Sequence, residues 1–63
     1  MRIDVNKIIR LLAEQEMTFS ELSLRSTVSR QSISTIVRRG SCIPKTAGRI
    51  AAGLGVPVAE IMM

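Results

Sequence analysis

Two helix-start signals lie so close together in this chain that the segment holding them can form only short helices joined by a tight turn. Thr18 is followed three residues later by Glu21, the spacing of a capping box, in which the Thr18 hydroxyl caps the Glu21 N–H and the Glu21 carboxylate reaches back to Thr18. Ser29 repeats the start signal. We therefore predict one helix over about residues 19–26 and a second over about residues 30–38. Helices joined by two or three residues must cross steeply.

Apolar residues recur at helical spacing on both sides of this pair. We predict further helices over residues 4–16 and 44–54 and a final turn or two over residues 57–62. Gly48 and Gly53 lie inside the helix predicted over residues 44–54, and we expect them to allow close helix packing. No segment has strand signals, so residues 1–63 are predicted to form one compact, all-α, five-helix domain. The buried stripes are expected to be Val5, Ile8, Ile9 and Leu12 in the first helix and Ala47, Ile50, Ala51 and Leu54 in the fourth.

Side chains for catalysis or metal binding are scarce. The chain has no His and one cysteine, Cys42, whereas a zinc site needs three or four nitrogen or sulfur ligands. The five carboxylates lie far apart, and there is no Gly-rich phosphate loop. We expect no enzyme activity, metal, cofactor or small-molecule substrate. A single cysteine forms no internal disulfide and no apolar run approaches the roughly 20 residues of a membrane span, so we expect a cytoplasmic protein outside the membrane.

Positive charge is concentrated in one part of the chain. Residues 22–59 contain six basic side chains and no acidic one, within a total net charge of +4. This distribution suits a polyanionic partner, nucleic acid first and an anionic membrane surface second, and on charge alone a solvated basic face is an equal alternative. Two of the six, Arg25 and Arg49, are expected to stay in solvent. The others are Arg30, Arg38, Arg39 and Lys45.

The helix over about residues 30–38 is amphipathic. At 100° per residue, Ile33, Ile36 and Val37 fall on one side. The helix contains no acidic residue, whereas a solvated surface helix more often mixes Glu with Lys. Its outer face therefore favours binding in the major groove of DNA. The residues on that outer face are Gln31, Ser34, Thr35 and Arg38.

Side-chain chemistry assigns base-reading roles at the start of this helix. Arg30 can pair with guanine O6 and N7, and Gln31 with adenine N6 and N7. Thr35, one turn further on, can offer its methyl group to thymine or its hydroxyl to a base edge or a phosphate. Ser34 is short and is expected to make only an auxiliary contact.

Phosphate contacts are expected from residues at helix ends. Arg38, Arg39 and Lys45 flank the loop that follows the helix, where contacts position a protein without reading sequence. The N-termini of the two crossing helices also expose N–H groups that bind phosphate. Capping alone accounts for Thr18 and Ser29, and a phosphate contact is the less favoured second role of each.

Residues 5–62 resemble the lambda-repressor-type helix-turn-helix domain of the Cro/CI (XRE) family, a compact five-helix DNA-binding fold. The resembling stretches are 17–22, 28–36 and 44–56. The resemblance implies a sequence-specific regulator of transcription, a repressor, that binds double-stranded operator DNA as a homodimer. It implies base reading by Arg30, Gln31 and Thr35, with Ser29 at the helix cap, and phosphate contacts from Arg39, Ser41 and Lys45 in the following loop.

Three positions depart from the family pattern. One is Ser23, which replaces the usual Ala at the contact between the two crossing helices and is tolerable if its hydroxyl bonds within its own helix. The turn between the crossing helices usually holds a left-handed Gly, and here it holds Thr27, whose branched side chain makes that conformation costly. Phe19 replaces a polar residue that contacts phosphate at the start of the first crossing helix, so that contact is lost.

Other functions share these features. An antitoxin that represses its own operon has the same fold, as does a protein-interaction module that does not bind DNA, and a basic membrane-surface peptide is a third alternative. The acid-free outer face argues against the module, and the capped helices argue against the peptide. A homodimer is expected to use apolar residues that the core does not consume, namely Ile43, Val58, Met62 and Met63.

Overall fold

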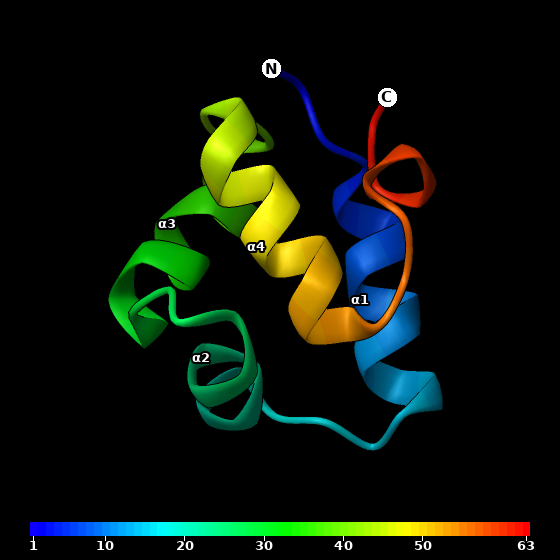
Figure 1. Cartoon of the computed structure of the whole chain (residues 1–63), viewed down its shortest axis with the longest axis vertical. Coiled ribbons are helices and arrows are strands. Elements are labelled where there is room, and N and C mark those ends of the chain that lie inside the picture. Colours follow the sequence, from blue (N-terminus) through cyan, green and yellow to red (C-terminus); the bar gives the residue numbers. More distant parts are fainter.

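The computed structural model describes residues 1–63 as an all-helical domain with no strand longer than a single bridge. The predicted all-α class is confirmed. Figure 1 shows α1 packed on one side of α4, with α2 and α3 on the other. No helix is long and apolar enough to cross a lipid bilayer, the longest having 11 residues. The helices are α1 (Val5–Glu14), α2 (Phe19–Ser26), α3 (Arg30–Arg39) and α4 (Pro44–Leu54).

The expected fifth helix is a single 3-10 turn, η1 (Val58–Glu60), so the prediction of five helices is wrong in that element. The chain after η1 forms backbone hydrogen bonds with the N-terminal segment instead of continuing a helix. The Asp4 N–H donates to the Ile61 carbonyl at 2.8 Å, and the Met63 N–H donates to the Arg2 carbonyl at 3.2 Å. These long-range bonds tie the C-terminal residues to the N-terminal segment.

Local signals account for most helix ends. Side chains of Asp4, Thr18 and Ser29 each accept a hydrogen bond, at 3.1 Å, from the N–H three residues later, as N-caps do. The Glu21 carboxylate is exposed and makes no hydrogen bond back to Thr18. Only one of the two hydrogen bonds of the predicted capping box is therefore present. Gly40 adopts the left-handed conformation that ends α3, with φ of 74°.

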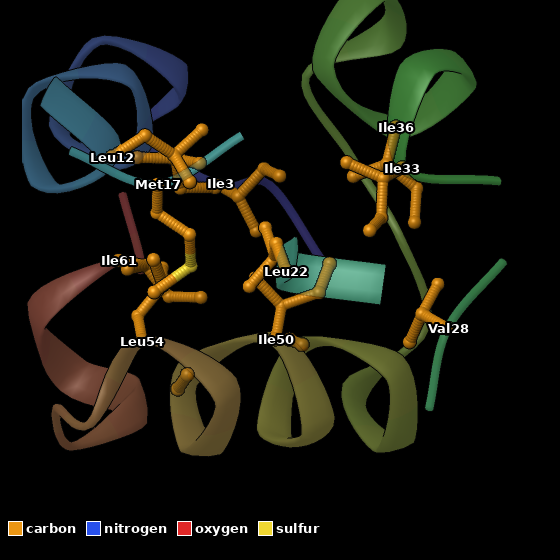
Figure 2. Close-up of a cluster of buried hydrophobic side chains, with 13 residues drawn as sticks. Ile3, Leu12, Met17, Leu22, Val28, Ile33, Ile36, Ile50, Leu54 and Ile61 are labelled. Atoms are coloured by element: carbon orange, nitrogen blue, oxygen red, sulfur yellow. The ribbon is translucent and has the colours of Figure 1, made fainter. Parts of the chain in front are cut away.

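The core lies between all four helices and contains no aromatic residue (Figure 2). Ile9 is the exception to the predicted stripes, since it is 44% exposed on the outer side of α1, which no other element covers. The buried apolar residues of the core are Ile3, Ile8, Leu12, Met17, Leu22, Val28, Ile33, Ile36, Ala47, Ile50, Ala51, Leu54 and Ile61.

The two glycines of α4 differ in their surroundings. A Cβ atom added at Gly53 would lie 2.9 Å from the Ser26 Cβ and 3.1 Å from the Ser26 Cα, so α2 approaches the α4 backbone at this point. The expectation of close packing is confirmed there. It is wrong at Gly48, which is exposed and has no atom of another element within 4 Å of the added Cβ.

The N-terminal segment fastens the loop that follows α3. The Ile3 N–H donates to the Gly40 carbonyl, and the Cys42 N–H donates to the Met1 carbonyl, both at 3.0 Å. Together with the bonds to the C-terminal residues, they form a clasp of three hydrogen-bonded segments, residues 1–4, 40–42 and 61–63. The clasp fixes the loop between α3 and α4, where phosphate contacts are expected.

Candidate nucleic-acid interface

The turn between α2 and α3 sets how α3 is presented. Thr27 has φ of 59° and ψ of 20°, the left-handed conformation expected at this position. The Thr27 hydroxyl donates to the Ser26 carbonyl, and the Ser26 hydroxyl, which is buried, accepts from the Val28 N–H at 3.2 Å. Figure 1 shows α2 close to end-on while α3 runs across the view, so the two helices cross steeply, as predicted.

The amphipathic pattern predicted for α3 is confirmed. Ile33 and Ile36 are buried and Val37 is half-buried against the core. The opposite face of α3 is open to solvent, because no other element covers it. On that face Gln31, Ser34 and Arg38 are exposed and Thr35 is half-buried.

One hollow lies between the N-terminal ends of α2 and α3, and we call it the α2-side hollow. Arg30 extends across it, and its Nη1 donates to the Ser20 hydroxyl at 3.4 Å, a long and therefore weak bond. Of the residues predicted to bind DNA, the hollow brings together Thr18, Arg30, Gln31 and Ser34. It is also lined by Phe19 and Ser20.

A second hollow, the α4-side hollow, lies on the other flank of α3, between that helix, the following loop and α4. Thr46 and Arg49 of α4 line it as well, and Arg49 is exposed, as predicted for a side chain in solvent. Helical spacing of three residues puts Thr46 and Arg49 on one side of α4, and that spacing was the available signal. The hollow brings together five of the predicted residues, Ser29, Gln31, Thr35, Arg39 and Ser41.

Gln31 lines both hollows and so lies on the crest of α3 between them. Arg38 and Lys45 are exposed but line neither hollow. The predicted residues therefore form a continuous surface across α3, with Arg38 and Lys45 outside its two depressions.

The charge of this surface is uncompensated. The only ion pair in the chain joins Lys7 Nζ to Glu60 Oε2 at 3.2 Å, and it links α1 to η1. The other eight of the nine basic side chains have no carboxylate partner, and neither hollow is lined by an acidic residue. Unpaired cations beside hollows free of carboxylates produce a positive potential that attracts anions.

The hydroxyl groups of the interface differ in whether their proton is already donated in a hydrogen bond. Thr18 Oγ1 accepts from the Glu21 N–H and keeps its proton free to donate. Ser29 Oγ donates to Ser32 Oγ at 2.9 Å, and Thr35 Oγ1 donates to the Gln31 carbonyl at 3.0 Å. A phosphate oxygen accepts hydrogen bonds and does not donate them, so Thr18 suits phosphate better than Ser29 or Thr35 does.

Cys42 lines the α4-side hollow as a half-buried thiol. Burial raises the pKa of this thiol, and the nearby positive charge of the Met1 amino group opposes that rise only in part. The thiol is therefore protonated at neutral pH, and it acts here as a small apolar contact rather than as a nucleophile.

Comparison of the chain with models of protein families, with curated proteins and with solved structures finds no match. The interface must be interpreted from its own chemistry. It presents hydrogen-bond donors and cations on a convex helix between two depressions, an arrangement suited to binding an extended polyanion.

Proposed function

We propose that this chain is a sequence-specific double-stranded DNA-binding protein that regulates transcription, a repressor of the Cro/CI type, with α2 and α3 as its helix-turn-helix. The observation that carries this proposal is the polar, acid-free outer face of α3, flanked by two hollows that contain unpaired arginines. The arrangement of four helices and a terminal turn is compatible with a lambda-repressor-like fold in which η1 takes the place of the fifth helix.

The dimensions of DNA support the proposed docking. An α-helix with its side chains is roughly 10–12 Å across, and the major groove is about 12 Å wide, so one helix fills it. With α3 in the groove, the duplex backbones on its two sides would meet the α2-side hollow and the α4-side hollow. Base edges would then face the crest of α3, where Gln31 lies.

In this pose Arg30, in the first turn of α3, would have to leave the α2-side hollow to reach a guanine. Its single bond to the Ser20 hydroxyl is 3.4 Å long, whereas guanine O6 and N7 offer two charge-assisted bonds. Exchanging the weak bond for the bidentate pair favours the complex. Gln31 is exposed with no hydrogen bond from its side-chain amide, so it is free to pair with adenine.

We also propose that the protein binds DNA as a two-fold homodimer. The clasp brings exposed apolar side chains of three segments together. Met1 is hydrogen-bonded to Cys42, the neighbour of Ile43. Arg2 is paired with Ser41 of the loop and also hydrogen-bonded to Met63. Ile43 is 62% exposed and Met63 is 79% exposed. A symmetric pair would place two copies of α3 in successive major grooves about 34 Å apart. The full set of exposed apolar residues here is Met1, Ile43, Val58, Met62 and Met63.

Titration of isotope-labelled protein with a mixed-sequence duplex, followed by NMR, tests the proposal. The amide signals of α3, Thr18 and Ser41 should shift most, and those of the outer side of α1, around Arg10 and Glu14, should stay unchanged. Shifts confined to α1, or no shifts at a concentration of duplex that saturates other DNA-binding domains, would contradict the proposed interface.

A further inference from the structure

The α4-side hollow contains a set of side chains that base reading does not require. Arg39 comes from the C-terminal end of α3 and Arg49 from α4, and both line the same hollow with no carboxylate beside them. Both side chains are exposed, and their two positive charges beside one hollow attract an anion to it. The hollow is therefore a candidate anion site.

Two hydroxyl groups in the hollow are unused. Ser41 and Thr46 are half-buried, and neither side chain makes a hydrogen bond within the protein. By contrast, the hydroxyls of Ser29 and Thr35 already donate to groups of α3. The free hydroxyls can donate to an oxyanion beside the arginine forks, which recognise the planar pair of oxygens on a phosphate.

We propose that the α4-side hollow holds one backbone phosphate of the bound duplex, and that Arg49 and Thr46 of α4 bind it together with Arg39 and Ser41. This inference rests on the proposed function and extends it, because it assigns α4 a direct contact with DNA. Arg38 and Lys45 lie outside the hollow and contact the duplex elsewhere or not at all. The clasp, which fixes residues 40–42, keeps the loop side of the hollow in place before DNA arrives.

The salt dependence of binding tests the contact. Each neutralised phosphate contributes about 0.9 to the slope of log K against log salt for duplex DNA. Arg49→Gln should flatten the slope on any duplex by less than one such step, because Arg39 still partly neutralises the shared phosphate. Arg25→Gln is the matched control, since Arg25 is exposed on α2 and lines neither hollow. If both arginines hold the same phosphate, the double variant Arg39→Gln with Arg49→Gln should flatten the slope by about one step rather than two.

The hydroxyl contact has its own pair of variants. Thr46→Val keeps the shape and removes the donor, and it should weaken binding by on the order of 10-fold, as expected for a bond to a charged group. Thr46→Ser restores the donor and should restore the affinity. Equal affinities for the Val and Ser variants would remove Thr46 from the site.

Replacing phosphates of a bound duplex one at a time with neutral methylphosphonate locates the contact. At one position the wild type should lose more affinity than Arg49→Gln does, because the variant has already lost one of its charged contacts to that phosphate. Free inorganic phosphate carries the same oxyanion as a backbone phosphate, so it is the other ligand that this hollow could bind, and it is titrated alone. If it binds the hollow and displaces DNA while no single duplex phosphate depends on Arg49, the hollow takes a free anion and the proposal is overturned.

The outcomes separate this inference from the proposed function. If the wild type binds no duplex, both fail. If the wild type binds duplex DNA with a steep salt slope and Arg49→Gln has the same salt slope as Arg25→Gln, the proposed function stands. Only the phosphate site in the α4-side hollow is then refuted.

Discussion

The two glycines within α4 are expected to respond to the same substitution with opposite signs. Alanine in a helix interior is more favourable than glycine by about 1 kcal/mol, and this gain applies equally to Gly48 and Gly53. At Gly48 the added methyl group meets nothing within 4 Å. Gly48→Ala should therefore stabilise the fold by about 1 kcal/mol, a rise in Tm of roughly 4–8 °C for a domain of this size.

At Gly53 the added methyl group would lie 2.9 Å from the Ser26 Cβ and 3.1 Å from both the Ser26 Cα and the Leu22 Cδ1. Two of these three atoms belong to or adjoin the α2 backbone, so relief requires α2 to move away from α4. Overpacking of this kind costs roughly 1–3 kcal/mol, which exceeds the helix-propensity gain over most of that range. Gly53→Ala should be less stable than the wild type by about 1 kcal/mol.

Thermal unfolding followed by circular dichroism measures both variants against the wild type. The difference between them isolates the cost of the contact, because the propensity gain cancels, and it should be about 2 kcal/mol. Gly48→Ala should also leave DNA binding unchanged, since Gly48 lines neither hollow. Equal melting temperatures for the two variants would refute the close approach of α2 to α4 on which the position of α3 depends.

Two further substitutions test the turn and the dimer. Thr27→Gly should stabilise the fold by about 1 kcal/mol in a melting experiment, because relief of left-handed strain outweighs the added freedom of the unfolded chain. If Thr27→Gly melts at a lower temperature than Thr27→Ala, Thr27 is unstrained. Ile43 is the N-cap residue of α4 and makes no capping bond, so Ile43→Ser should raise stability by about 1 kcal/mol while weakening self-association in sedimentation. Unchanged sedimentation of protein and DNA complex would exclude Ile43 from the dimer interface.

Features set by neighbouring residues could be predicted from the sequence. The caps at Thr18 and Ser29 depend on a side chain and an N–H three residues apart, and the start at Pro44 depends on one residue with a fixed φ. The amphipathic face of α3 follows from helical geometry in the same way. Consequently most of the predicted site residues gather on one surface.

Features set by distant residues could not be predicted. The clasp joins backbone groups that lie 37 to 61 positions apart in the sequence, and backbone hydrogen bonds do not depend on which side chains the residues carry. The different surroundings of Gly48 and Gly53 depend on where α2 lies, and α4 alone gives no information about that. Arg49 is exposed, in agreement with its predicted place in solvent, but the sequence does not indicate the hollow beside it, which forms only when α3, the loop and α4 come together.

Selection of bound sequences from a pool of random duplex DNA tests the central proposal most directly. The wild type should enrich one motif, present as two inverted half-sites whose centres are about 10 base pairs apart. Arg30→Ala and Gln31→Ala should each lose preference at one position of the half-site and weaken binding to it by roughly 1–3 kcal/mol. Enrichment of no motif by the wild type, or the same motif from all three proteins, would contradict sequence reading by α3.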